Sequence, residues 1–520
     1  MNKTSKKLMA LTLAAGFAFS AFTGCGAVKA DDGTKNETNQ TEQTTQKTKD
    51  TLVVVMESEP PTLHPFDHKA VTAGYMNTLT FNQLFKTDPE TLEPVPDLCK
   101  SYEQLDDTTW QFTIYDNVTF HDGSHMTAED VVASMEWAKT FSTTKDYTSF
   151  WSALEVVDEY TVKVTTNGPY ALTLLDLSSI KIVPKALIDS GHDFGADPVG
   201  SGPYKFVSQT LGDKIEFEAF DQYFDTAHAP KIKYLTWRIV PEGSSRTIAL
   251  EAGEADFIVE VETNDLERLE SMDTVEVQTV SGTRVNFLTV NNEVPPFDNQ
   301  YFRKAVNAAI DKEAVLTVAL NGQGKAAYSM CPTAFEGTSM DNTQKYDVEK
   351  AKEYLKLSGI DPTTVSFSCI VSTDTARRAA EVIQACLQEL GIQMSIESMD
   401  YAAYLNAVMG GGYTAAVSGY TSTSLARYLM GVFHSSAINA ANMPRVQDAK
   451  VDELINLAKT QTNLDDSKAT YEQVTAYLNE LTPFAPLYES VVTRAYNADL
   501  KGVVVGASGS VRFEDLYWAD

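Results

Sequence analysis

Two histidines four residues apart, His121 and His125, have a spacing that suggests chemistry. Glu129 and Asp130 follow closely, and two histidines at i and i+4 on one helix, with an acid nearby, form a common metal site. His121 opens the stretch His-Asp-Gly, however, which is a turn sequence. The two rings therefore do not share a helix face, and we predict structural roles for both and no metal site.

Other sequence patterns that mark enzymes are missing. The chain has no G-x-S-x-G nucleophile elbow and no cysteine–histidine signature. The glycine-rich stretch GSGPY leads into a strand pattern rather than a helix, so it does not fit a phosphate-binding loop. The number of acidic residues does not test for a glycosidase-type pair of carboxylates. Among 71 Asp and Glu residues some pairs are certain to lie close together by chance. We therefore expect a binding protein and keep a secreted hydrolase as the weaker alternative.

The composition is that of an acidic protein with enough apolar residues for large cores. Its 520 residues correspond to two to four domains, and 43% of them are hydrophobic. The formal net charge is −30, and a chain of this charge repels phosphate backbones. We expect no nucleic-acid partner, and solubility alone is the simplest explanation of the acidity.

Four cysteines lie in the part of the sequence that has strand and helix patterns, and none has metal-site spacing: Cys99, Cys331, Cys369 and Cys386. Cys369 lies in a strand pattern and Cys386 in a helix pattern, so we expect small buried apolar side chains. Disulfides are permitted outside the cell, but the sequence does not pair these cysteines. We expect no cofactor.

The N-terminal segment has the pattern of a secretory signal. MNKTSKK carries three lysines and no acid, and the apolar run LMALTLAAGFAFSAF ends at Thr23-Gly24-Cys25. Small residues before such a cysteine resemble the lipobox of bacterial lipoproteins, in which the thiol is lipidated and the cysteine becomes the mature N-terminus. We favour a lipoprotein signal over 1–24, with lipidation at Cys25, over ordinary cleavage or an uncleaved anchor helix. Residues 25–50 lack large apolar side chains, so we predict a disordered tether.

From Thr51 onward, strand and helix patterns follow each other. TLVVVMES, at 51–58, is continuously apolar, as in a strand buried within a parallel sheet. WQFTIYDNVTF alternates apolar and polar residues, as in a half-buried strand. Beyond residue 347, strands and helices alternate regularly. This order indicates an α/β fold of open sheets covered by helices.

Several helix bounds are also predicted. Thr127 and Asp130 form a capping-box pattern before a helix over 128–141. We predict one helix over 73–85 and another over 295–316, where apolar residues recur on one face.

Four stretches occur in one order along the chain: LEPVPDLCKSYEQLDDTTWQFTIYDNVTFHDGSHMTAEDVVASMEWA, GSGPYKF, LEAGEADF and NNEVPPFDNQYFRKAVNAAID. In this order they resemble the extracytoplasmic solute-binding proteins of the dipeptide/oligopeptide/nickel class (family 5), which serve ABC importers. The first stretch is the densest match, with its FHDG turn and TAEDV helix start. The resemblance extends from about Thr51 to Val505, and its strength lies in the shared order of the four stretches.

The resemblance implies a periplasmic-binding-protein-like fold of type II, with two α/β lobes and the ligand in the cleft between them. It implies lobe I over 50–86, 195–283 and 485–520, an inserted domain over 87–194, and lobe II over 284–484. Ligand stabilises a hinge-closed form that the transporter recognises. We accordingly expect an extracytoplasmic monomer, held at the membrane by its lipid, that delivers a dipeptide, oligopeptide or other small polar solute to ABC permease subunits.

The resemblance also implies ligand contacts, chiefly from the segments LHPFDHKAV and SGYTSTSLARY. The candidates are Lys69, Ala70 and Val71 in the first segment, Gly419, Tyr420, Thr421, Thr423 and Arg427 in the second, Arg284 and Asn286 on the second crossover between lobes, and Tyr147 and Phe150 in the inserted domain. For the crossover and inserted-domain residues, plain packing is the alternative.

Peptide-binding members of the class often have a Trp after this glycine and then an acid that pairs with the α-ammonium group of the peptide. Here Tyr420 takes the aromatic position, and the hydroxyl-bearing residues Thr421 to Ser424 follow without an acid. Because a buried ammonium without a carboxylate is costly, we hypothesise that this amine clamp is absent. Hydroxyls suit a neutral, polyhydroxylated or amide-rich ligand, and Arg427 either holds an anionic group or is a solvated helix residue. A solute sensor is the alternative function.

Overall fold

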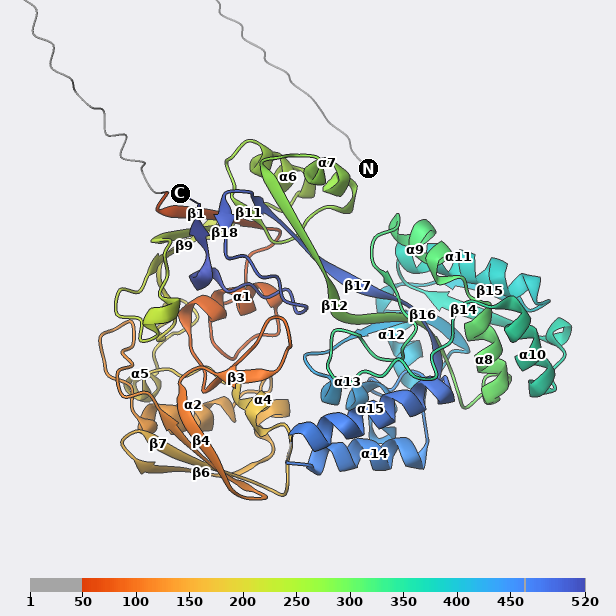
Figure 1. The fold of residues 1–520 in the computed structure, drawn as a ribbon, viewed down its shortest axis with the longest axis horizontal. Coiled ribbons are helices and arrows are strands. Elements are labelled where there is room, and N and C mark those ends of the chain that lie inside the picture. The colour runs from red at the N-terminus through yellow and green to blue at the C-terminus, as the bar shows by residue number, and fades with distance from the viewer. Residues whose placement is uncertain (1–48, 463, 520) are drawn as a thin grey trace, which may run out of the picture. The chain divides into compact units, whose positions relative to one another are not determined.

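The computed structural model describes residues 49–462 and 464–519, whose helices and strands are arranged as in Figure 1. The predicted signal segment 1–24, the predicted lipidation at Cys25 and most of the predicted tether 25–50 lie outside these residues. The described part is mixed α/β structure, as the sequence patterns predict. None of its helices combines the length and the apolar composition needed to cross a membrane.

Two long antiparallel strands, β12 (Val275–Val290) and β17 (Phe484–Asn497), run through the middle of an 11-stranded sheet. The strand order β15-β14-β16-β12-β17-β11-β1-β10-β9-β8 shows that they connect two groups of strands, which we call the β16 group and the β1 group. In Figure 1 they are the two long ribbons between these groups. Their register shifts between Ser281 and Val285, and such irregularities bend strands and disrupt the ladder.

The β1 group begins at the first strand after the predicted tether. β1 pairs in parallel with β10 and β11, and Leu52, Val54, Val55 and Met56 are fully buried, as the continuous apolar sequence predicts. The elements are β1 (Thr51–Met56), α1 (Val71–Thr80), β8 (Tyr204–Thr210), β9 (Lys214–Ala219), β10 (Tyr234–Ile239), α6 (Gly243–Glu251), β11 (Phe257–Ile258) and α7 (Leu266–Glu270), with β18 (Leu500–Lys501) and β19 (Tyr517–Trp518) as a separate pair.

A four-stranded sheet, β4-β5-β7-β6, a two-stranded sheet, β2-β3, and the helices of the same stretch of chain form what we call the small-sheet region. Trp110, Phe112 and Ile114 of β5 are buried, as predicted, and Thr127 and Asp130 form the predicted capping box. The elements are β2 (Phe85–Thr87), β3 (Pro94–Pro96), β4 (Cys99–Asp106), β5 (Thr109–Ile114), α2 (Ala128–Ala138), α3 (Lys145–Thr148), β6 (Trp151–Asp158), β7 (Thr161–Thr166), α4 (Thr173–Leu177) and α5 (Lys185–Ser190).

The β16 group carries most of the helices on the right of Figure 1. β14 pairs in parallel with both β15 and β16, which confirms the alternating strand–helix pattern beyond residue 347. The elements are α8 (Gln300–Ala309), α9 (Lys312–Leu320), β13 (Lys325–Ala326), α10 (Val348–Ser358), β14 (Ser366–Val371), α11 (Asp374–Glu389), β15 (Gln393–Ser398), α12 (Tyr401–Gly410), β16 (Ala415–Thr421), α13 (Leu425–Val432), α14 (Ala449–Thr460) and α15 (Leu464–Leu481).

The helix predicted over 73–85 is shorter in the structure. α1 ends at Thr80, and the backbone of Phe81 is extended. Gln83 forms an antiparallel bridge with Lys181, so pairing with a distant segment replaces the last helical turn that local sequence favours.

The helix predicted over 295–316 is two helices, α8 and α9. The side chain of Asp311 accepts hydrogen bonds from the backbone nitrogens of Glu313 and Ala314, at 3.1 Å each, and so begins a new helix. The apolar spacing continues across the break, which is why periodicity alone does not reveal it.

The cysteines in the described residues are unpaired. Cys99, Cys331 and Cys369 are buried, and Cys386 is half-buried. Burial raises the pKa of the Cys99 and Cys369 thiols to about 12. These three thiols therefore behave as the small apolar side chains that the sequence predicts.

Candidate functional site

Two cavities meet at the carboxyl end of β16. The larger, about 500 Å³, opens between the small-sheet region and helices α13 and α14, and we call it the Tyr147 cavity. The smaller, about 380 Å³, lies beside β12, α11 and α12, and we call it the Arg284 cavity. Tyr420 and Thr421 line both, so the end of one strand forms their shared wall. Each cavity has the size of a small-molecule pocket.

Aromatic rings form much of the wall of the Tyr147 cavity. The rings of Phe150 and Tyr170 stack with 4.2 Å between centroids, and the Lys459 ammonium lies 4.4 Å from the centre of the Phe150 ring. This cavity brings together six of the predicted ligand contacts: Tyr147, Phe150, Tyr420, Thr421, Thr423 and Arg427. Candidates from two distant parts of the chain therefore share one space.

Arg427 is part of a buried ion pair. Its Nη2 contacts Asp176 Oδ1, and the guanidinium lies 4.5 Å from the centre of the Tyr147 ring. Asp176 is fully buried and also accepts a hydrogen bond from the Tyr170 hydroxyl (2.9 Å). Burial raises the pKa of Asp176 to about 7, although Arg427 acts against the shift. Arg427 is therefore not a solvated helix residue, which was one interpretation of the sequence. One of its guanidinium nitrogens is already paired with a carboxylate of the chain.

A carboxylate that sequence reasoning missed lies in the same cavity. Asp146 of α3 is exposed and lines the Tyr147 cavity. Tyr420 lines the same cavity, and the charge of Asp146 adds to the rise that burial causes in the pKa of Tyr420. The cavity with the aromatic position therefore also contains an acid, from a segment that no local sequence signal connects to Tyr420.

The Arg284 cavity has a cation without an acidic partner. Arg284 Nε donates to Asn286 Oδ1 (3.0 Å), and its Nη1 lies 3.4 Å from Thr421 Oγ1. Within the described residues, no carboxylate lies within 4.0 Å of this guanidinium. Four tyrosines and two methionines form much of the remaining wall: Tyr401, Tyr404, Tyr420, Tyr488, Met409 and Met443. The cavity can therefore offer a ligand one positive charge, that of Arg284, in a wall made largely of tyrosine rings.

Gly419 leaves room for this arrangement. It pairs with Asn286 across β12 and β16, and a Cβ at this position would come within 2.6 Å of both Arg284 Nη2 and Asn286 Oδ1. Any larger residue would displace the two polar side chains. Gly419, Arg284 and Asn286 thus lie together on the wall of the Arg284 cavity. The sequence predicted each of them as a ligand contact only from its position in the family.

The structure does not bring Lys69, Ala70 and Val71 to either cavity. Ala70 is the N-cap of α1, Lys69 is exposed, and Val71 is 63% exposed. Their role as ligand contacts stays a prediction that this arrangement does not support.

The two histidines are engaged with protein groups. His121 is buried, its Nε2 lies 2.9 Å from the carbonyl oxygen of Gly202, and burial lowers its pKa to about 4. His125 Nε2 lies 3.2 Å from the Tyr160 hydroxyl. In the part of the chain that is described, no group of three or more His, Cys, Asp or Glu side chains is placed to hold a metal ion.

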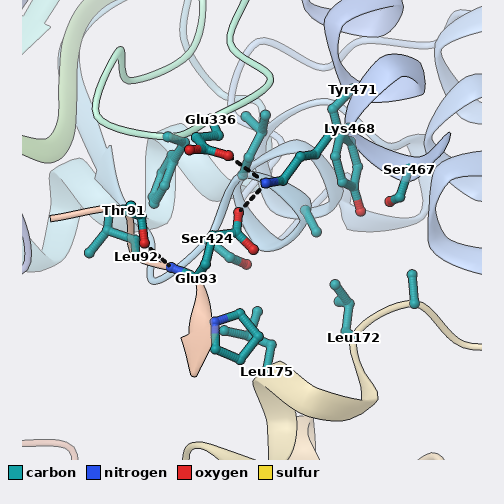
Figure 2. A pocket seen from close by; sticks show the side chains of 15 residues that line it. Thr91, Leu92, Glu93, Leu172, Leu175, Glu336, Ser424, Ser467, Lys468 and Tyr471 are labelled. Atoms are coloured by element: carbon teal, nitrogen blue, oxygen red, sulfur yellow. Dashed lines mark hydrogen bonds and ion pairs between the residues drawn. The ribbon is translucent and has the colours of Figure 1, made fainter. Parts of the chain in front are cut away.

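A second set of contacts joins the small-sheet region to the β16 group beside the cavities. Figure 2 shows Lys468 of α15 between Glu336 and Glu93, with an Nζ to Glu93 Oε1 distance of 3.6 Å. Leu92 is 5% exposed and packs in the same cluster as Leu425 and Tyr471. A space of only about 70 Å³ is left between these side chains.

A backbone hydrogen bond crosses the same boundary, from Ala171 N to the carbonyl oxygen of Lys459 (2.8 Å). We call these contacts, together with the Arg427–Asp176 pair, the clasp. The clasp holds the two sides of the Tyr147 cavity together through groups of the chain itself.

The sequence matches a family model. Residues 93–439 match the model described as bacterial extracellular solute-binding proteins, family 5. The dipeptide-binding protein of Escherichia coli is 24% identical over 90% of this chain and 94% of that protein. The glutathione-binding protein GsiB of Pectobacterium atrosepticum is 28% identical over 69% of this chain and 71% of that protein.

The solved structure of HbpA2 from Haemophilus parasuis has the same fold, with a TM-score of 0.84 at 23% identity over 90% of this chain and all of that one. The family match spans well over half of the chain and includes most of the residues that line the two cavities. The chain therefore belongs to the bacterial extracellular solute-binding proteins, family 5.

Proposed function

We propose that the chain is a lipid-anchored receptor that captures a small polar solute and delivers it to an ABC importer. Two neighbouring cavities of small-molecule size carry this proposal, because a ligand in either one would contact Tyr420 and Thr421, which line both. The names of the dipeptide- and glutathione-binding relatives support a peptide-like solute. We further propose that the receptor acts as a monomer.

The charges favour a solute with at least one anionic group. Arg284 presents a guanidinium that has hydrogen-bond partners but no ion pair within the described residues, and Arg prefers carboxylate ligands. Asp146 gives the Tyr147 cavity a carboxylate that can accept an ammonium group. We therefore replace the sequence hypothesis of a neutral ligand with a zwitterionic or anionic one.

Hinge closure is the proposed mechanism. β12 and β17 connect the two strand groups, and their register shifts between Ser281 and Val285, next to Arg284. Ligand that contacts both sides of the cavities favours the closed form by its differential affinity. The clasp acts in the same direction, so ligand and clasp together set the closed population.

A calorimetric panel tests the ligand class. We expect Ala-Ala to bind, its C-terminal amide to bind much more weakly, and its N-acetyl form to report the contribution of Asp146. Maltose and a nickel–histidine chelate complete the panel. Tight binding of maltose with no binding of the peptides would show that the proposed class is wrong.

Arg284→Gln should weaken binding of Ala-Ala by about 100-fold, because loss of one partner of a charged hydrogen bond costs about 2–5 kcal/mol. Affinity for the C-terminal amide should hardly change, and titration calorimetry measures both. Arg377→Gln on α11 removes a partly exposed arginine that lines neither cavity and is the matched control. Equal losses for acid and amide would contradict a carboxylate contact.

Cys25→Ala should release the protein from the membrane fraction without changing its solute affinity, because the anchor and the cavities are separate. Fractionation followed by immunoblotting measures the release. A variant that stays in the membrane fraction would contradict lipidation at this cysteine.

The alternative function is a solute sensor that uses the same closure to address a receptor. Uptake of labelled ligand by a deletion strain separates the two: unchanged uptake of every ligand that the protein binds would favour the sensor.

A further inference from the structure

A third cavity, of about 170 Å³, lies apart from the two cavities at β16. Its walls come from the end of α1, from β2 and the chain after α4, and from the C-terminal loop around Ser508–Glu514. None of its lining residues lines the Tyr147 or Arg284 cavity. We call it the Lys181 cavity.

Three cations line this space: Lys86, Lys181 and Arg512. The Lys181 ammonium donates to Gln83 Oε1 and, within the described residues, has no carboxylate within 4.0 Å. Burial lowers the pKa of Lys181 to about 8. A partly buried ammonium without an acid partner is stabilised by an anion from outside the chain.

Two of the three cations already have an acid partner: Lys86 pairs with Asp97, and Arg512 Nη2 lies 3.1 Å from Asp88 Oδ2. Among the described residues, Lys181 is the cation of this cavity that has none within 4.0 Å. Asp97 already accepts hydrogen bonds from Asn82 Nδ2 (3.1 Å) and from the backbone nitrogen of Gln83 (2.9 Å), and it lies 3.6 Å from Lys86 Nζ. Burial raises the pKa of Glu514 to about 7, so its carboxyl group is partly protonated at neutral pH. In that form it can donate a hydrogen bond to an anion.

Hydroxyl groups complete the lining. Thr87 and Ser178 lie 3.4 Å apart across the cavity wall, and the Ser508 hydroxyl contacts that of Ser510 (3.0 Å). Several Ser and Thr hydroxyls together with three cations suit a compact ion whose oxygens point in several directions. The volume is about a third of the Tyr147 cavity, so the space suits a small ion and not a peptide.

We propose that the Lys181 cavity binds a small inorganic oxyanion of the phosphate or sulfate class, held by Lys86, Lys181 and Arg512. The ion would connect three segments that are distant in the sequence: β2, the chain after α4 and the C-terminal loop. It would thereby fix the small-sheet region to the β1 group. This site is independent of the proposed solute function.

Titration calorimetry and thermal unfolding of the full chain test this proposal, with sodium phosphate and sodium sulfate as probes and sodium chloride at matched ionic strength. We expect saturable binding of phosphate or sulfate and a rise in Tm. Lys181→Gln should weaken the affinity at least about tenfold, since a charge-assisted hydrogen bond is lost, and Lys86→Gln serves as a second variant. Lys345→Gln, an exposed lysine elsewhere, should bind as the wild type does.

The Arg284→Gln variant locates the ion. Phosphate affinity that survives Arg284→Gln and falls in Lys181→Gln supports the Lys181 cavity. Loss in Arg284→Gln alone would place the ion in the solute site and overturn the proposal. Absence of saturable binding in the wild type, or equal affinity in Lys181→Gln, would overturn it as well.

Discussion

Arg427→Met is expected to lower the free energy of unfolding by about 3–5 kcal/mol, the usual loss when one partner of a buried ion pair is removed. The Asp176 carboxyl group is fully buried, and among the described residues only the Tyr170 hydroxyl and Arg427 hydrogen-bond to it. Methionine keeps much of the side-chain volume but leaves this acid without its cation. Urea unfolding followed by circular dichroism measures the loss.

The loss should depend on pH, with a sign that follows from Asp176. Its folded pKa is raised to about 7, so the native state binds more protons than the unfolded state between the ordinary aspartate pKa and neutrality. Without Arg427 the folded pKa rises further, and the ionised form costs still more. The destabilisation by Arg427→Met should therefore grow as the pH rises through about 7, where the wild-type penalty levels off and that of the variant does not.

Two further variants separate the clasp from general effects. Arg377→Met removes a partly exposed arginine paired with Glu381, and we expect a change of only about 0–1 kcal/mol. The double variant Arg427→Met with Asp176→Asn should recover most of the lost stability, because no buried charge remains. A loss by Arg427→Met that is independent of pH and not recovered by Asp176→Asn would contradict the pairing.

The same variant reports on closure. The clasp joins the small-sheet region to the β16 group through chain groups alone, so its loss should favour the open form. Small-angle X-ray scattering of Arg427→Met should give a larger radius of gyration, and solute affinity should fall because the closed population is smaller. An unchanged radius would show that β12 and β17 alone set the opening.

Sequence reasoning predicted the architecture well, because burial patterns are local. The apolar run at β1, the alternation at β5 and the capping box before α2 each follow from neighbouring residues, and the structure confirms them. The family match confirms the resemblance, the two-lobed periplasmic-binding-protein-like fold, the extracellular location and a binding protein rather than an enzyme. The predicted domain bounds stay predictions; the one at 283/284 falls within β12.

The site was predicted only in part, because its charges come from segments that meet in three dimensions. Sequence reasoning placed Tyr420 and Arg284 in the cleft and found no acid after Tyr420. Asp146 of α3 lines the same cavity as Tyr420, and Asp176 of α4 pairs with Arg427 of α13. Neither α3 nor α4 gives a periodic signal of its own, since each is a turn or so long. Pairings of this kind require the packing of the small-sheet region against α13.

Lys312→Met is expected to raise the stability of the protein by about 4 kcal/mol near neutral pH, at about 1.4 kcal/mol for each unit of pKa shift. Lys312 is 1% exposed, and its Nζ has no hydrogen-bond partner within the described residues. Burial lowers its pKa from 10.5 to about 7, and the Tyr328 ring lies under the ammonium, with its centre 4.9 Å away. Its position in the first turn of α9 also sets a cation against the helix dipole.

The pH dependence identifies the cause. Between about pH 7 and pH 10.5 the unfolded chain holds the Lys312 proton and the native chain does not, so wild-type stability rises through this window. The penalty is fully present below the window and absent above it. The gain from Lys312→Met should therefore be largest near neutrality and vanish near the upper end. Lys345→Met, at an exposed lysine, should show no such dependence, and a gain that stays constant with pH would mean that packing and not the buried charge is responsible.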